Sequence, residues 1–397
     1  MHGEYSAALT ISNCKINLML TGNKIFDVCF ISINEINKDA RTLNMARTLV
    51  KNAYSVCIIA FGNQVDSDYL SKENIILFPV EKKNYKKALR RIRDFYRGSK
   101  KYFDIATAKY YIAEDLYSLR VAVKLKKLFG GKLIYDSREI YSALGPLSDK
   151  PFRQRILTAY EKHYIKKVDK FIVTGSMDEE YLRSHFKTDK PFTIIMNLPP
   201  YRDVVKSNLL REKYSIGNDK NIIIYQGELL PGRGIIPVIK SLQYFNEAVL
   251  CIFGQGSFRE EIINESIKNN VIDRVFLCGS VPYDELHKWT SSADAGLSFI
   301  EPVSFSYQLA LPNKLFEYCM ARIPSLVSDL PAMNKIIEEY QIGIAISSES
   351  TPEQIANALK ILCDDSNKET FIKNCDSASH TLNFETQEEK ILSLVGD

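Results

Sequence analysis

The chain has 397 residues, of which 45% are hydrophobic and 25% charged, with a formal net charge of +4. This composition is typical of a folded globular protein and excludes a mainly disordered, collagen-like or low-complexity chain. It also excludes a transmembrane helix, because no window of 18 consecutive apolar residues occurs. The N-terminus lacks a basic region before an apolar run, so we expect no signal peptide. Eight scattered cysteines without a Cys-x-x-Cys pair predict reduced, buried thiols in a cytosolic protein.

In residues 1–200, short and nearly continuous apolar runs alternate with amphipathic stretches of helical length. These runs occupy 26–33, 54–62, 132–136, 170–175 and 192–197. Unbroken, β-branched runs of this kind predict parallel strands that are buried on both faces of a sheet. Their alternation with helices indicates an α/β fold with a doubly wound sheet.

The N-terminal half is basic, with 34 Lys and Arg against 21 Asp and Glu in residues 1–200, whereas the remainder has 18 against 27. Ten of these cations lie in residues 82–101, against one acid, Asp94. An apolar stripe with helical spacing accompanies them: Tyr85, Leu89, Ile92 and Tyr96. The segment predicts either a core-packed surface helix with a solvated basic face or docking on anionic lipid, where each cation contributes about 1 kcal/mol. Nucleic acid is a weaker partner for this segment, because no recognised binding module accompanies the charge, and we expect none.

The alternation breaks at 197–207, where Pro199 and Pro200 stand among polar residues and predict a linker. It restarts with apolar runs at 221–227, 248–256, 274–280, 295–300, 323–329 and 342–347. We therefore predict two Rossmann-like, doubly wound domains, at residues 1–200 and 201–380. A C-terminal helix at 381–397 is expected to pack back toward the N-terminal domain.

The most informative stretch is 309–331, in which a short helix is predicted before a strand. Pro312 and Asn313 stand where this helix would start, and Pro324 follows its end. At 100° per residue, one face carries Lys314, Glu317 and Tyr318, and the other, buried face carries Leu315, Phe316, Cys319 and Met320.

The polar face of this predicted helix has two interpretations. The helix N-terminus and Lys314 would receive a diphosphate, and Glu317 would accept hydrogen bonds from ribose hydroxyls. Alternatively, the segment is an amphipathic surface helix with one i,i+3 ion pair between Lys314 and Glu317, and periodicity alone favours that interpretation.

The run PNKLFEY (312–318), followed by IPSLVSDLP (323–331), resembles the donor-site signature of family 4 retaining glycosyltransferases, of the "glycosyl transferases group 1" type. Further segments agree in order and spacing: 135–141, 171–182, 194–200, 225–242, 250–262 and 275–300. The resemblance covers about residues 26–395. It implies the GT-B fold, in which two Rossmann-like doubly wound domains face each other across a cleft.

The resemblance places the donor site in the C-terminal domain. It implies catalytic roles for Arg233, Lys314 and Glu317, with Arg233 where the family has a phosphate-binding basic residue. The donor-binding residues that it implies are Gly227, Arg233, Gly254, Val281, Asn313, Lys314, Leu315 and Glu317. Gly254-x-Gly256 lacks the third glycine of a dinucleotide fingerprint, so it predicts a tight turn after a strand.

This sequence departs from the family pattern at several positions. Leu309 stands where relatives carry a Glu eight positions before Glu317, and Glu301, a possible substitute, lies eight residues too early. Glu228 replaces the usual Arg after the strand glycine, which leaves Arg233 as the basic residue of that loop. On the acceptor side, the resemblance points to residues where relatives often carry histidine and to their neighbours: Glu114, Asp115, Arg138 and Glu139.

The activity that the resemblance implies is retaining transfer of a sugar from a nucleoside diphosphate sugar, with a UDP-sugar favoured, to a glycan or lipid-linked acceptor. Such an enzyme must stabilise the charge on the leaving diphosphate, and one well-placed donor typically contributes about 3 kcal/mol. No Asp-x-Asp metal motif is evident in the predicted donor domain, so we expect no metal and no cofactor. We expect the enzyme to act in cell-surface polysaccharide or glycolipid assembly. We expect it to be a cytoplasmic protein that binds peripherally to the inner face of the cytoplasmic membrane. The alternatives are a non-catalytic GT-B subunit of a partner transferase and a sugar-nucleotide epimerase.

Overall fold

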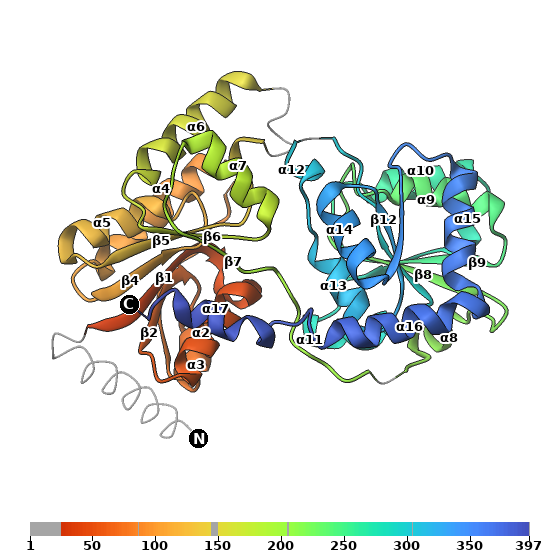
Figure 1. The fold of residues 1–397 in the computed structure, drawn as a ribbon, viewed down its shortest axis with the longest axis horizontal. Helices are drawn as coiled ribbons and strands as arrows, with labels where there is room; N and C mark the ends of the chain where they lie inside the picture. Colours follow the sequence, from red (N-terminus) through yellow and green to blue (C-terminus); the bar gives the residue numbers. More distant parts are fainter. Residues whose placement is uncertain (1–24, 86, 144–149, 205, 304, 397) are drawn as a thin grey trace. The chain divides into compact units, whose positions relative to one another are not determined.

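The computed structural model describes residues 25–85, 87–143, 150–204, 206–303 and 305–396 (Figure 1). The predictions for the N-terminal 24 residues, for Cys14 and for Lys86 fall outside the described residues. The chain divides into two compact units. The first unit comprises residues 25–141, 155–195 and 388–396, and the second comprises 196–387 with a short segment from 142–154.

The first unit contains a seven-stranded parallel sheet in the order β3-β2-β1-β4-β5-β6-β7. Its strands are β1 (Phe26–Glu35), β2 (Val56–Phe61), β3 (Ile75–Val80), β4 (Ala108–Ala113), β5 (Lys132–Ser137), β6 (Lys170–Val173) and β7 (Phe192–Ile194). Five of them match the predicted runs, whereas β3 and β4 were not predicted. The completely buried residues of β2 show why unbroken apolar runs indicate parallel strands covered on both faces.

Helices cover both faces of this sheet (Figure 1). The helices are α2 (Ala40–Lys51), α3 (Gln64–Ser71), α4 (Ala88–Ser99), α5 (Leu119–Phe129), α6 (Pro151–Ile165), α7 (Ser176–Phe186) and α17 (Glu388–Ser393). Asp39 starts α2 by accepting a hydrogen bond from the Thr42 amide. Helix α17 packs against α2, where the Asn52 amide donates to Glu388 at 2.7 Å. The helix predicted over 381–397 is therefore shorter, since a 3₁₀ turn at Glu385–Gln387 precedes α17.

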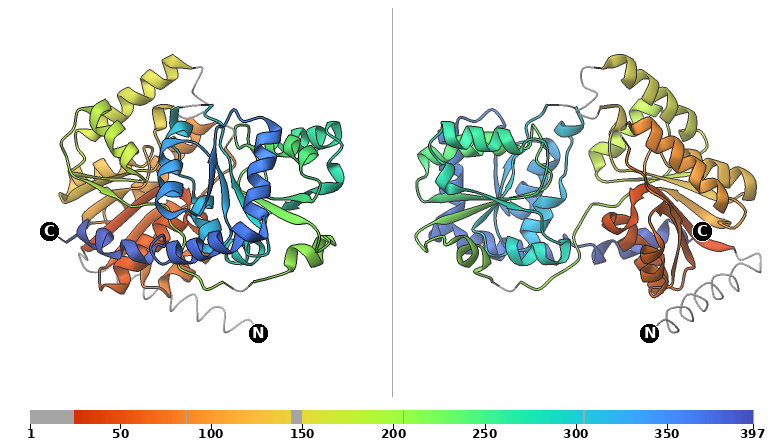
Figure 2. Two further views of the ribbon diagram at one scale, coloured as in Figure 1. Left: turned by 45° about the vertical axis from the view of Figure 1, so that its right-hand side comes forward. Right: turned by 180° about the vertical axis from the view of Figure 1, so that it is seen from behind.

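The second unit contains a six-stranded parallel sheet in the order β10-β9-β8-β11-β12-β13. Its strands are β8 (Asn221–Gln226), β9 (Ala248–Phe253), β10 (Val275–Gly279), β11 (Ala295–Ser298), β12 (Ser325–Ser328) and β13 (Gly343–Ile346). All six match the predicted runs. The prediction of two doubly wound α/β sheets is therefore confirmed, and the views in Figure 2 show helices on both faces of each sheet.

Two apolar layers enclose the sheet of the second unit. On one face lie α9 (Ile235–Ser241), α10 (Arg259–Lys268) and α15 (Pro352–Cys363). On the other lie α13 (Asn313–Met320), α14 (Pro331–Tyr340) and α16 (Asp365–Ser379). The remaining helices of this unit are α8 (Leu209–Tyr214), α11 (Tyr283–Thr290) and α12 (Phe305–Gln308).

Helix α13 begins and ends as predicted but is buried almost all around, so the predicted exposed face is wrong. Tyr318 is the reason why this face is buried. Its hydroxyl accepts a hydrogen bond from the backbone amide of Gln226 and donates one to the Leu297 carbonyl, both at 3.2 Å. Gly296 provides the space, because a Cβ at that position would lie 2.3 Å from the Tyr318 ring. Close contact with the sheet therefore buries Lys314 and Tyr318 as well as the apolar side.

The apolar stripe predicted in residues 82–101 is also corrected by the structure. Helix α4 starts only at Ala88, so Tyr85 lies before it, and Leu89 is 81% exposed. The inward face is centred on Phe95, whose ring packs edge-on against Phe61 at 5.2 Å. Contact with a specific aromatic partner, rather than the longest apolar repeat, therefore sets the orientation of α4.

The described cysteines carry free thiols, and all except the half-buried Cys278 are buried, as predicted. Over the described residues, no helix has the length and apolar character needed to cross a membrane.

Candidate active site

The sheet of the second unit has a topological switch point between β8 and β11. The chain runs from β8 through β9 to β10 on one side and then returns to β11 beside β8. In open parallel sheets, ligands bind in the crevice outside the carboxyl ends of the strands at such a point. We therefore expect a ligand site at the loops after β8 and β11 and at the start of α13.

Glycines bring the turns after β8 and β9 into backbone contact at this edge. Gly227 and Gly254 have φ angles of 134° and 146°, which strain other residues. A Cβ on Gly254 would lie 1.8 Å from the Gly227 carbonyl oxygen, so no side chain fits there. The turn predicted at Gly254 is present, and it leaves the exposed Gly227 backbone accessible to a ligand.

Lys314 lies beneath this turn, in the first turn of α13. Its side chain is only 8% exposed, and Nζ lies 4.0 Å from the centroid of the Tyr225 ring. Nζ is also 3.9 Å from the position that a Cβ of Gly227 would take. Burial and the nearby Arg233 lower the pKa of Lys314 to about 7, although Glu317 opposes this shift. Among the described residues, Lys314 has no carboxylate within ion-pair distance.

Arg233 comes from the loop between β8 and α9. Its neighbours Gly232 and Gly234 both have positive φ angles, and a Cβ on Gly234 would lie 2.0 Å from the Phe299 carbonyl oxygen. The loop therefore packs on the end of β11. The Arg233 guanidinium lies 4.7 Å from the centroid of the Tyr307 ring. Two neighbouring cations over aromatic rings form an environment that an anion would stabilise.

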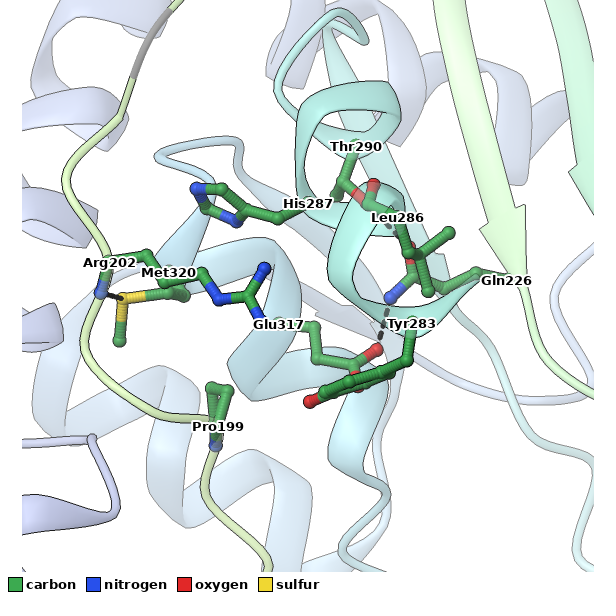
Figure 3. Close-up of a pocket in the computed structure, with 9 residues that line it drawn as sticks. All are labelled: Pro199, Arg202, Gln226, Tyr283, Leu286, His287, Thr290, Glu317 and Met320. Atoms are coloured by element: carbon green, nitrogen blue, oxygen red, sulfur yellow. Dashed lines mark hydrogen bonds between the residues drawn. The ribbon is translucent and has the colours of Figure 1, made fainter. Parts of the chain in front are cut away.

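Glu317 lies one helical turn after Lys314 and lines a pocket in the second unit (Figure 3). Its carboxylate accepts hydrogen bonds from the side-chain amide of Gln226 and from Tyr283. Thr290 in turn donates to Gln226 Oε1 at 2.8 Å, which fixes the orientation of that amide. Burial is the main reason why the pKa of Glu317 is raised. Glu317 is thus held in position by α11 and β8.

The other residues predicted for the donor site lie in different surroundings. Asn313 is exposed at the first position of α13, and Val281 is half-buried in the segment after β10. The side chain of Leu315 is in the apolar core, and its amide donates to the Pro312 carbonyl. Leu315 therefore presents no side chain to this site.

The departures from the family pattern can also be placed. Leu309 follows α12 and is half-buried, and Glu228 is exposed beside Gly227. The Glu301 amide donates to the Gly232 carbonyl at 3.1 Å, which brings Glu301 next to the loop of Arg233.

The residues predicted for the acceptor side lie at the carboxyl ends of the strands in the first unit's sheet. This place is again a switch point, between β1 and β4. Asp115 is buried and accepts from the amides of Ile33, Tyr117 and Ser118, so it joins the ends of β1 and β4. Glu139 is exposed. Glu114 and Arg138 are part of a buried charged cluster.

This N-terminal charge cluster consists of Asp39, Arg41, Glu114, Asp136 and Arg138. Arg138 binds Asp39 at 2.8 Å, Asp136 at 3.1 Å, and Glu114. Arg41 makes two bonds to Asp136, at 2.8 and 3.0 Å. Burial and the neighbouring carboxylates raise the pKa of Glu114 well above its usual value, whereas the arginines help to keep those of Asp39 and Asp136 low. With Glu114 protonated, two cations face two anions.

Several residues around Glu317 were not predicted, namely Arg202, Gln226, Tyr283, His287 and Thr290. Only Gln226, the last residue before the strand glycine, has a position in the sequence that could have indicated it.

No group of three or more His, Cys, Asp or Glu suited to a metal ion occurs in the part of the chain that the structure describes.

The comparisons with known proteins agree with this geometry. Residues 206–376 match the family model "Glycosyl transferases group 1". No curated protein matches the chain. Solved structures give the same fold at low identity, among them sucrose-phosphate synthase (tll1590) from Thermosynechococcus elongatus, with a TM-score of 0.78, 16% identity and coverage of 93% of this chain and 98% of that one.

Two further solved structures are similar over almost their whole length. Anabaena Alr3699/HepE in complex with UDP and glucose has a TM-score of 0.72 at 12% identity, covering 94% of this chain and 100% of that one. WaaG, a glycosyltransferase involved in lipopolysaccharide biosynthesis, has a TM-score of 0.69 at 16% identity, covering 93% and 99%. Residues 206–376 therefore match the glycosyl transferases group 1 family, and the chain as a whole has the two-domain GT-B fold of these solved structures.

Proposed function

We propose that this protein is a retaining glycosyltransferase that moves a sugar from a UDP-sugar to a glycan or lipid-linked acceptor, in cell-surface polysaccharide or glycolipid assembly. The observation that carries the proposal is the pair of cations, Lys314 and Arg233, beside the side-chain-free backbone of Gly227. The complex of HepE with UDP and glucose supports the choice of nucleotide. The role of WaaG in lipopolysaccharide biosynthesis supports the class of acceptor.

In this proposal the diphosphate of the donor lies between the Gly227 turn and the start of α13. Lys314 and Arg233 neutralise the charge that grows on the leaving diphosphate as the glycosidic bond breaks, and each contributes about 3 kcal/mol to the barrier reduction. Glu317, one turn further, accepts hydrogen bonds from the ribose hydroxyls. The leaving phosphate oxygen then takes the proton of the acceptor hydroxyl.

The first unit is proposed as the acceptor domain. Glu139 is its exposed candidate, whereas Glu114, Asp115 and Arg138 hold the strand ends beside it. Helix α4 is the proposed contact with an anionic membrane at the cytoplasmic face. Lys87, Arg90 and Arg93 are exposed on or next to the first turns of α4, around the exposed Leu89. Charge and an apolar anchor together favour binding to anionic lipid.

A thermal-shift panel of nucleoside diphosphates and sugar nucleotides tests the donor assignment. A ligand at a hundredfold excess over its Kd adds about 2.7 kcal/mol of stability, which is enough to rank the nucleotides. NMR of the transferred sugar then reports whether the anomeric configuration is retained. Binding without transfer or donor hydrolysis would favour a non-catalytic subunit, and inversion of the anomer would contradict a retaining mechanism.

Vesicle co-sedimentation tests the membrane assignment. Replacing Lys87, Arg90 and Arg93 by Glu should release the protein from acidic vesicles, and salt should weaken binding of the unchanged protein. The matched control replaces three exposed cations of the second unit, Arg259, Lys288 and Lys335, by Glu. Equal binding to neutral and acidic vesicles would contradict this assignment.

A further inference from the structure

Two cysteines of the second unit, Cys251 and Cys278, lie side by side on neighbouring strands. Cys251 is buried in β9, and Cys278 is half-buried in β10, the edge strand of this sheet. The register pairs Phe276 with Cys251 and then shifts between Leu277 and Gly279, so Cys278 lies in a bulge without a register partner. Both cysteines adjoin one apolar cluster, which places them on the same face of the sheet.

The thiols of Cys251 and Cys278 are in direct contact. Cys251 donates a hydrogen bond to the Cys278 sulfur, and this bond is the main reason why the pKa of the Cys278 thiol is lowered. Burial opposes this shift, whereas Tyr214, the Ile252 amide and the charge of Lys213 support it. The contact and burial together raise the pKa of the Cys251 thiol. Cys278 therefore has the thiolate character and partial exposure of a reactive cysteine, and a protonated thiol stands beside it.

We propose that Cys278 is a redox-modification site and that Cys251 is its resolving partner. The Cys278 thiolate attacks a peroxide, which breaks the O–O bond, oxidises the sulfur to a sulfenic acid and releases the other oxygen as hydroxide. The Cys251 thiol then attacks the sulfenic sulfur, so that an S–S bond forms and the S–O bond breaks. The hydroxyl group and the thiol proton leave as water. The peroxide is the two-electron oxidant, and a reducing thiol reverses the change.

This disulfide acts on the Gly227 turn of the candidate site, a consequence that rests on the proposed function. Gly279, next to Cys278, accepts a hydrogen bond from the Gly254 amide at 2.8 Å. Gly254 in turn packs so closely on the Gly227 carbonyl oxygen that a Cβ would lie 1.8 Å from it. A covalent bond is shorter than the hydrogen-bonded contact that it replaces, so oxidation draws the ends of β9 and β10 together. The Gly227 backbone shifts with them, and binding of a diphosphate weakens.

A second pair of neighbouring thiols in the same unit provides an internal comparison. Cys319 of α13 and Cys375 of α16 are fully buried, and Cys319 Sγ lies 3.5 Å from the Cys375 carbonyl oxygen. Contact with Cys319 and burial raise the pKa of the Cys375 thiol. This pair therefore has contact without an exposed thiol, and a peroxide should leave it reduced. Exposure and the nearby positive charge, rather than proximity alone, select Cys251 and Cys278.

Peptide mapping of the full chain after treatment with hydrogen peroxide tests the assignment, with free thiols blocked before digestion. The expected product is a Cys251–Cys278 disulfide, while Cys319 and Cys375 remain reduced. Isothermal titration with UDP should then give a Kd about tenfold higher, because small displacements of a binding turn are costly, and dithiothreitol should restore the original Kd. Cys278→Ser should bind UDP normally and keep its affinity in peroxide. Cys251→Ser should instead accumulate the sulfenic acid, which dimedone traps.

The matched control is Cys363→Ser, which changes another buried thiol of the second unit and should respond to peroxide like the unchanged protein. Thermal unfolding confirms that each variant is folded before oxidation. Peroxide treatment that joins another pair of cysteines, or none, would overturn the proposal. A Cys251–Cys278 disulfide that leaves the UDP affinity unchanged would overturn its coupling to the Gly227 turn. If the reduced protein does not bind UDP, the proposed function fails, while the peptide map still decides the assignment of Cys278.

Discussion

Both units bury charged side chains at the carboxyl ends of parallel strands, but they balance those charges in different ways. In the first unit, Arg41 and Arg138 are surrounded by carboxylates at 2.8–3.1 Å. In the second unit, Lys314 and Arg233 lie over tyrosine rings, and no carboxylate pairs with either among the described residues. A cluster with paired charges holds loops together, whereas neighbouring cations without counter-charges indicate a place for an anionic ligand.

The largest effect is expected from breaking the paired cluster. Arg138→Met would leave Asp39 and Asp136 buried with only Arg41 as a cation, and removing one partner of a buried ion pair costs about 3–5 kcal/mol. The free energy of unfolding in urea measures this loss. Arg93→Met is the control, because its ion pair with Asp94 is exposed and should contribute less than about 1 kcal/mol. A similar, small loss for both variants would contradict the structural role of the cluster.

In the second unit, removing a cation should lower activity rather than stability. Lys314→Met and Arg233→Met should each lower kcat/KM for transfer by about 10²–10³, because each removes a charge that stabilises the leaving group. The melting temperature of Lys314→Met should not fall, since a buried ammonium without a counter-charge is unfavourable in the free protein. Lys335→Met, an exposed change, controls for the loss of charge. Unchanged turnover in both site variants would remove the basis of the proposed function.

The fold was largely predictable because unbroken apolar runs in the sequence indicate buried parallel strands. The exceptions are β3 and β4, in which Pro79 and the Lys109-Tyr110-Tyr111 run interrupt that pattern. Missing β4 mattered, because Glu114 and Asp115 directly follow it. The N-terminal charge cluster joins residues far apart in the sequence, and only the strand order places their loops together.

The candidate site was predictable where its residues share one helix or where the resemblance named them, as it did for Arg233 and Gly227. Lys314 and Glu317 follow from the spacing and the resemblance, whereas Gln226, Tyr283 and Thr290 reach Glu317 from other elements. Periodicity describes one element at a time, so it carries no information on such contacts. The burial of Lys314 likewise depends on how closely α13 approaches the sheet.

A smaller effect should appear in the pH dependence of donor binding. Only the ammonium form of Lys314 attracts the diphosphate, and its pKa in the free protein is about 7. The Kd of a UDP-sugar, which has no group that titrates near neutral pH, should therefore be constant below pH 6 and rise above pH 7 by up to about tenfold per unit. Titration calorimetry from pH 6 to 9 measures this trend, which Lys314→Met should abolish. A Kd independent of pH in the unchanged protein would show that Lys314 does not titrate there.

The last effect concerns Glu114, the one carboxyl group of the N-terminal charge cluster whose pKa is raised. Its pKa is raised above 4.5 in the folded protein, so between 4.5 and the folded value the folded state holds a proton that the unfolded state has lost. The stability of the unchanged protein therefore falls as pH rises through this window, and Glu114→Gln, which cannot ionise, escapes that loss. The two proteins should differ little at pH 4, and urea unfolding should show Glu114→Gln gaining stability relative to the unchanged protein as the pH rises from 4.5 toward 7. A variant that instead becomes less stable than the unchanged protein as pH rises would mean that Glu114 is ionised. The cluster would then hold three anions against two cations, and the charge balance that distinguishes it from the Lys314 site would be lost.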